Sequence, residues 1–105
     1  MSDKVLLEEA MRRRAVFNNL ERYLEKIKRV VESLDKDGEV YLFGSVVEGG
    51  YTLSSDIDVL IVTEKDPFQV RAELWRAGIT DPFELHIYTP EQAEQLKRRG
   101  RLRKI

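Results

Sequence analysis

The sequence predicts an α/β (α+β) domain in which a small β-sheet of three or four strands is covered by helices. Three observations indicate this class. The chain has 105 residues, enough for a single domain over residues 1–105 and too few for two. A hydrophobic fraction of 42% supports a buried core and excludes a wholly disordered chain. Helix-like and strand-like apolar patterns alternate along the sequence, as expected for a sheet with helices packed on it.

A helical pattern occupies residues 3–34, and Ser2 or Asp3 can cap its start. Residues 18–19, both asparagine, leave open whether this is one long helix or two; in the second case Asn18 is the cap and Glu21 the third helical residue. Apolar residues recur at steps of three and four, and this spacing predicts a core-facing stripe formed by Phe17, Leu20, Leu24, Ile27, Val31 and Leu34.

Four apolar residues near the start of this helix extend beyond what a small sheet needs to cover. They are Val5, Leu6, Ala10 and Met11. Core packing is the expected role of the helical stripe as a whole, because an apolar face of this width usually lies against a core. For these four residues, a surface for a partner helix is the alternative.

Three strands are expected, at residues 40–43, 57–63 and 83–88. The first is apolar on both faces and is therefore expected in the interior of the sheet. The second is rich in β-branched residues. The third alternates, so that Phe83, Leu85 and Ile87 share one face and the other face carries Glu84, His86 and Tyr88. Periodicity alone does not fix whether the strands run parallel.

Turn and capping residues define the connections between these strands. Residues 35–38, Asp-Lys-Asp-Gly, are typical of a turn. The polar segment that follows the first strand leaves room for one helical turn after Ser45. A helix is expected from Asp66, which precedes a proline at the first helical position, to Gly78, a glycine past its end.

The C-terminal region combines a strong helix start with a basic tail. Thr89 is the expected cap of the last helix, with Gln92 at the third helical position. The helix is expected to fade after Gly100 into the tail, residues 97–105, whose basic residues are Lys97, Arg98, Arg99, Arg101, Arg103 and Lys104. A solvated or frayed end is the expected interpretation, and a contact with phosphate, nucleic acid or an acidic partner is the alternative.

Composition excludes several classes of site. The 18 basic and 19 acidic residues nearly cancel, so the net charge indicates no partner. The absence of cysteine excludes a disulfide scaffold, a thiolate metal site and a cysteine nucleophile, and one histidine excludes a multi-histidine zinc site within the chain. No apolar stretch approaches the roughly 18 residues of a membrane span, and the N-terminus lacks a signal-peptide pattern. We therefore expect a cytoplasmic protein with no membrane contact.

Gly44 and Ser45 directly follow the first strand. Glycine lets the backbone turn sharply and brings amide groups close to a ligand. If Ser45 opens a helical turn, its amide and hydroxyl can hold phosphate oxygens. An ordinary turn is the alternative, because Gly-Ser after a strand is a common turn sequence.

Asp56 and Asp58 stand at the start of the second strand. Residues two apart in a strand point to one face, about 6.5 Å apart along the chain. Two carboxylates in this position repel each other unless a cation lies between them. Their hard oxygens favour magnesium or manganese over zinc. Two solvated acids at a strand end are the alternative.

Glu84 is a candidate third carboxylate of the same site. If its strand lies beside the Asp56–Val62 strand, the three acids can converge; otherwise Glu84 is an acid on a half-exposed edge strand. His86 shares its face and could line the site, although a partly buried structural role is the favoured interpretation.

The order of these features resembles a known family. Phe43-Gly44-Ser45, followed after ten residues by the segment Asp56-Ile57-Asp58, is similar to the signature of the nucleotidyltransferase superfamily that includes DNA polymerase beta and kanamycin nucleotidyltransferase. The small size resembles its minimal nucleotidyltransferases, and the resemblance covers roughly residues 20–95. It implies the nucleotidyltransferase fold, with a small mixed sheet.

The resemblance also implies roles for individual residues. Gly44 and Ser45 would hold the nucleotide phosphates, and Asp56 and Asp58 would bind metal. Glu84 would be the third acid, where the family more usually has aspartate. The implied reaction transfers a nucleoside monophosphate, AMP from ATP in the expected case, to a hydroxyl of a protein or small molecule. It would use two Mg²⁺ ions, with Mn²⁺ as an alternative. Near the aspartates, Ser55 is a further candidate for phosphate binding.

A chain of this size offers little surface to grip both nucleotide and acceptor, so a partner or a second copy is expected to complete the site. The resemblance implies a small helical HEPN-type protein as that partner. An antitoxin-like subunit that neutralises the partner by binding alone is the alternative to an enzyme. Nucleic-acid binding by the tail ranks last, because the aromatic residues offer no evident stacking surface.

Overall fold

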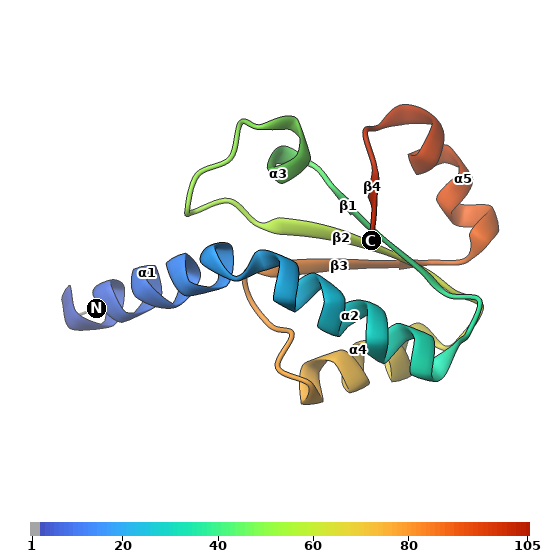
Figure 1. The fold of residues 1–105 in the computed structure, drawn as a ribbon, viewed down its shortest axis with the longest axis horizontal. Coiled ribbons are helices and arrows are strands. Elements are labelled where there is room, and N and C mark those ends of the chain that lie inside the picture. Colours follow the sequence, from blue (N-terminus) through green and yellow to red (C-terminus); the bar gives the residue numbers. More distant parts are fainter. Residues whose placement is uncertain (1–2) are drawn as a thin grey trace.

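The structure, a computed structural model, describes residues 3–105 and contains a four-stranded sheet covered by helices (Figure 1). Its helices are α1 (Asp3–Asn18), α2 (Leu20–Leu34), α3 (Ser45–Glu48), α4 (Pro67–Arg76) and α5 (Pro90–Arg99). Its strands are β1 (Glu39–Phe43), β2 (Ile57–Val62), β3 (Phe83–Tyr88) and β4 (Arg103–Lys104). The strand order is β3-β2-β1-β4, with β2 parallel to β3 and β1 antiparallel to both of its neighbours. The predicted fold class, including the mixed sheet, is confirmed.

Alternation along the strands divides the core between the two faces of the sheet. One face carries Val59 and Ile61 of β2 and packs against α2 and α4. The other carries Leu60 and Val62 and packs against α5 through Ala93 (Figure 1). Both faces of β2 are buried because the strand is apolar at consecutive positions, as in strands covered on both sides. The same face of the sheet carries the polar side chains of Asp58 in β2 and of Glu84 and His86 in β3.

The stripe of α2 and the capping of α4 agree with the sequence. Leu24, Ile27 and Val31 are fully or almost fully buried on one side of α2. Asp66 caps α4 by accepting a hydrogen bond from the backbone N–H of Phe68 at 3.1 Å. The central position predicted for the first strand is also confirmed, because β1 lies between β2 and β4.

The N-terminal helical segment is two helices, interrupted at Asn19. The prediction that Asn18 caps the second helix is wrong: Asn19 occupies the cap position, and its side-chain amide donates instead to the carbonyl of Ala15 at 2.7 Å. The local bond back to α1 competes with capping. Of the two proposed caps of α1, Ser2 lies outside the described residues, and Asp3 is already helical.

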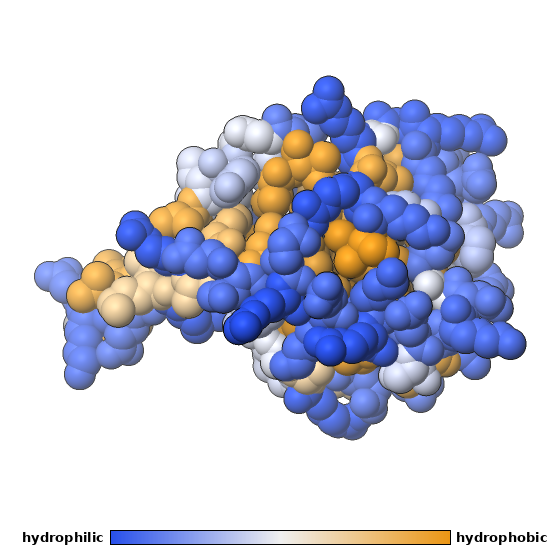
Figure 2. All heavy atoms as spheres, in the orientation of Figure 1, coloured by the Kyte–Doolittle hydropathy of each residue, from blue (hydrophilic) through white to orange (hydrophobic). Residues whose placement is uncertain are grey.

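Helix α1 projects beyond the end of the sheet (Figure 1). Its buried side chain is Val16, near the junction with α2. Leu6, Leu7 and Met11 are 55%, 61% and 63% exposed. Figure 2 shows apolar atoms along this projecting helix. The predicted stripe therefore belongs to the core, whereas these apolar residues nearer the start of α1 lie on the surface. Within residues 3–105, no helix has both the length and the apolarity needed to span a membrane.

The basic tail is not a frayed end. The capping box of α5 is present as predicted, with Thr89 and Gln92 bonded reciprocally. After Gly100 the chain forms β4, an edge strand paired with Tyr41 and Leu42 of β1. Two tail lysines bind one carboxylate of β1, since Lys97 and Lys104 lie 3.1 and 3.3 Å from Glu39. The strand was missed because its two residues are too few to show an alternating pattern.

Candidate active site

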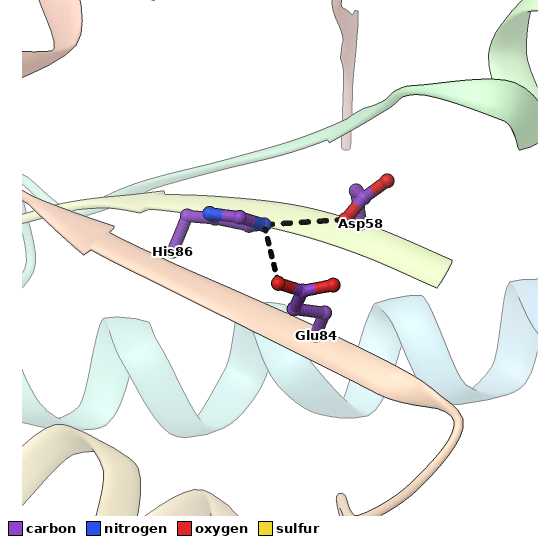
Figure 3. Close-up of side chains that lie close together, drawn as sticks. All are labelled: Asp58, Glu84 and His86. Atoms are coloured by element: carbon purple, nitrogen blue, oxygen red, sulfur yellow. Dashed lines mark hydrogen bonds and ion pairs between the residues drawn. The ribbon is translucent and has the colours of Figure 1, made fainter. Parts of the chain in front are cut away.

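The register of the two parallel strands brings two of the predicted acids together. Asp58 of β2 is paired with Glu84 of β3, and by alternation both lie on the face of the sheet that carries Leu60 and Val62. His86 lies two residues further along β3, and its ring turns back toward both carboxylates (Figure 3). Side chains two apart in a strand share a face, so this convergence follows directly from in-register pairing.

These three side chains form a compact cluster. His86 Nε2 lies 3.2 Å from Asp58 Oδ1, within hydrogen-bonding distance, and 3.9 Å from Glu84 Oε1. One ligand atom from each of the three residues lies within 4.8 Å of the others. Asp58 and His86 are about one-quarter exposed, whereas the Glu84 side chain is 54% exposed and forms the open side of the cluster.

Asp58 also lies against the backbone at the start of α3. Gly44 has φ +76°, and a Cβ added there would collide with Asp58 Oδ2. With ψ near −154°, this is a conformation that is essentially restricted to glycine. Gly44 is therefore required both by its own backbone geometry and by the close approach of a carboxylate. This places Gly44-Ser45 beside the acidic cluster, as the sequence predicts for a site that joins phosphates to a cation.

Asp56 and Ser55 lie in the loop before β2, outside this cluster. Within residues 3–105, the group that satisfies the geometry of a metal site contains Asp58, Glu84 and His86 but not Asp56. The Asp56 side chain is 56% exposed, and its Oδ1 lies 3.9 Å from the guanidinium of Arg13. The Ser55 hydroxyl oxygen accepts a hydrogen bond from the backbone N–H of Thr52 at 3.0 Å. The predicted ligand roles of Asp56 and Ser55 stay predictions.

One of the two interpretations of His86 did not exclude the other, and one contact near the site was missed. His86 is partly buried as expected, and it also lines the cluster; the signal was its position on the face of Glu84. Arg13 was missed because it is 40 residues from Leu53, whose carbonyl it binds. No local pattern reports such a contact.

A hollow lies between the end of β3 and α5. Its volume is about 780 Å³, within the range of small-molecule sites. The ring of Tyr88, on the edge of this hollow, lies 6.3 Å from the ring of His86. The lining residues come from the end of β3 and from α5: Tyr88, Thr89, Glu91, Gln92, Gln95, Leu96 and Arg99.

The comparison with known families decides the identity of the fold. Residues 24–104 match the family model described as the nucleotidyltransferase domain. The chain belongs to the nucleotidyltransferase family. A crystal structure described as a "putative nucleotidyltransferase" is similar with 34% identity and a TM-score of 0.59, over 77% of this chain and 95% of that one. No curated protein matches the chain.

A second solved structure, described as a "putative nucleotidyltransferase" from Sulfolobus solfataricus, is 25% identical, with a TM-score of 0.49, over 90% of this chain and 85% of that one. The family match shows that the protein is a transferase, and it confirms the predicted family and enzyme class. Members usually use a divalent metal and a nucleoside triphosphate, and the cluster of Asp58, Glu84 and His86 is a possible acidic metal site of that kind.

Proposed function

We propose that this nucleotidyltransferase transfers AMP from ATP to a hydroxyl of a protein or small-molecule acceptor in the cytoplasm, with two Mg²⁺ ions, or Mn²⁺, at the acidic cluster. The observation that carries the proposal is the position of Asp58, which faces both Glu84 and the backbone of Gly44. A triphosphate approaching Gly44 would meet the cation site directly. A position this close to a strand–helix turn suits a phosphate-bearing substrate, because backbone amides are accessible there.

The donor set fits a hard divalent cation. Asp58 and Glu84 offer carboxylate oxygens, the ligands that Mg²⁺ and Mn²⁺ prefer, and Asp56 would join them from the neighbouring loop. His86 would orient Asp58 through the 3.2 Å contact or offer an imidazole nitrogen. When bound, Mg²⁺ neutralises phosphate charge and favours the ionised form of the acceptor hydroxyl.

The remaining steps fall to the chain's own groups. Because Gly44 has no side chain, the phosphates would be able to approach the backbone amides there. The hydroxyls of Ser45 and Ser55 would bind phosphate oxygens. Glu84 is the most exposed member of the cluster, so one of its carboxylate oxygens would take the proton of the acceptor hydroxyl. The acceptor oxygen then bonds to the α-phosphorus as the bond to the bridging oxygen breaks, and pyrophosphate leaves.

The test is transfer of label from α-labelled ATP in the presence of Mg²⁺. Wild type should label an acceptor and release pyrophosphate, whereas Asp58→Asn should lose at least about 10²- to 10³-fold in rate, because the cation that would neutralise the reacting phosphates loses a charged ligand. Glu94→Gln is the matched control, since Glu94 is an exposed acid of α5 that pairs with Arg98 at 3.7 Å. Equal rates in Asp58→Asn and wild type would contradict the proposal.

A second candidate is an antitoxin-like subunit that neutralises a small helical HEPN-type partner by binding alone, rather than by catalysis. The exposed apolar residues of α1 favour it, because Leu6, Leu7 and Met11 are more than half exposed on a helix that projects from the body. A double variant, Asp56→Ala with Asp58→Ala, separates the two candidates. If it still neutralises the partner fully, binding alone is the function; if neutralisation is lost while complex formation persists, transfer is required.

A further inference from the structure

Helix α1 binds the loop that leads into β2. The side chain of Arg13 is only 14% exposed although α1 projects from the body. Its Nε donates to the carbonyl of Leu53 at 2.8 Å, and its Nη2 donates to the carbonyl of Ser55 at 2.9 Å. The third nitrogen, Nη1, donates to Asp81 Oδ2 at 2.8 Å. One planar guanidinium therefore joins α1 to the segments that precede β2 and β3.

The same guanidinium lies beside a predicted ligand. Ser55 directly precedes Asp56, so the bond to the Ser55 carbonyl restrains the peptide that enters Asp56. Nη2 also lies 3.9 Å from Asp56 Oδ1. The hydrogen bond restrains the backbone that enters Asp56, and the ion pair places a positive charge beside its carboxylate. Lysine could not reproduce them, because its ammonium is a single point donor whereas arginine presents donors in a rigid fork.

The rest of the loop has few restraints of its own. Gly49 and Gly50 have open space around them, and the residues at 51–54 are exposed. The loop's internal bonds join Thr52 to Ser54 and Ser55 and do not reach the body. A second tie to α1 is the stacking of Tyr51 on Phe17, with ring centroids 5.4 Å apart. The position of the loop is thus set largely from α1.

We propose that Arg13 is a positioning residue for nucleotidyl transfer: it holds the loop before β2 so that Asp56 reaches the cation bound by Asp58. The inference rests on the proposed metal-dependent function. It assigns to α1 a role in the site itself, in addition to any role as a docking surface.

The experiment measures the Mg²⁺ dependence of two quantities. Nucleotide binding is followed by thermal shift with a non-hydrolysable ATP analogue, and turnover is followed by pyrophosphate release from ATP. For Arg13→Ala we expect the Mg²⁺ concentration for half-maximal binding to rise about 10- to 100-fold, the usual effect of removing a residue that orients a metal ligand. Arg14 is a neighbouring exposed arginine, so Arg14→Ala is the matched control and should behave as wild type. Arg13→Lys should be impaired as well, and it provides a charged variant should Arg13→Ala fail to fold.

A merely structural role would lower stability without moving the Mg²⁺ dependence of the folded protein. Free guanidinium at millimolar concentration, well below denaturing levels, should partly restore the Mg²⁺ dependence of Arg13→Ala and leave Arg14→Ala unchanged. If wild type binds Mg²⁺–ATP and both Arg13 variants match it, the role of Arg13 is overturned and the proposed function stands. If wild type itself binds no Mg²⁺–ATP, both proposals are overturned.

Discussion

The two parts of the candidate site are held in different ways. Asp58 and Glu84 lie on neighbouring strands, and the backbone register between β2 and β3 places them side by side. Asp56 lies in a loop, and its surroundings are set by side chains of α1 that are distant in sequence. The strand acids are thus positioned by backbone pairing alone, whereas the position of the loop acid depends on an arginine that is distant in sequence.

The largest effect is expected at the strand half of the site, from a pair of glycine substitutions. Gly44 and Gly49 both have positive φ, at 76° and 91°, but only Gly44 faces Asp58; Gly49 has open space around it. Alanine at either position should cost about 1–3 kcal/mol of stability from backbone strain. Gly44→Ala should in addition displace the Asp58 carboxylate and abolish most Mg²⁺-dependent ATP binding.

Urea unfolding and Mg²⁺–ATP thermal shifts, measured on both glycine variants, separate strain from displacement. Loss of binding in Gly49→Ala as large as in Gly44→Ala would show that general strain, and not the contact with Asp58, is responsible. Retention of binding in Gly44→Ala would remove the structural argument for a phosphate beside the cluster.

The smallest effect is expected far from the site, at the pairing of the tail with β1. The hydrogen bond from Lys97, opposed in part by burial, lowers the pKa of Glu39 below its usual value. A lowered folded-state pKa stabilises the protein above the unfolded value, near 4.5, and this contribution is lost as the pH falls through the folded value. Because both side chains are about one-third exposed, solvent screens the pair and we expect about 0.5–1 kcal/mol at most.

Urea unfolding of wild type and Glu39→Gln at pH 7 and pH 3 measures this contribution. The difference between the two proteins should be present at pH 7, shrink in high salt and decrease from pH 7 to pH 3, as the pH falls below the unfolded pKa and toward the lowered folded-state pKa of Glu39. Metal-dependent ATP binding should be the same in both. A stability difference that is unchanged at pH 3 would show that packing, and not charge, accounts for the effect of the substitution.

The convergence of the strand residues was predictable from the sequence, whereas the contact of Arg13 with the loop that carries Asp56 was not. Alternation in β3 correctly separated the face of Glu84 and His86 from the apolar face, because strand side chains have a period of two. The convergence of Glu84 with Asp58 was a conditional prediction, which the in-register pairing of β2 and β3 fulfils. The part played by Arg13 depends on folding α1 back against residues 53–56, and no local pattern specifies such a contact.

The same distinction, between local patterns and contacts distant in sequence, explains where the predicted fold was wrong. The capping box at Thr89 is a local motif and was predicted correctly. The fourth strand has two basic residues, and its formation depends on the exposed edge of β1 rather than on its own sequence. At the α1–α2 junction, Asn18 is still helical and Asn19 takes the cap position, where its side chain bonds to Ala15 in place of a capping bond.

The most direct test of the central claim is a crystal structure with Mn²⁺ and a non-hydrolysable ATP analogue, with the metal located by its anomalous scattering. The account predicts a Mn²⁺ peak bonded to carboxylate oxygens of Asp58 and Glu84, with the triphosphate beside Gly44. Mn²⁺ bound elsewhere, with the two carboxylates turned apart and the nucleotide away from Gly44, would contradict it.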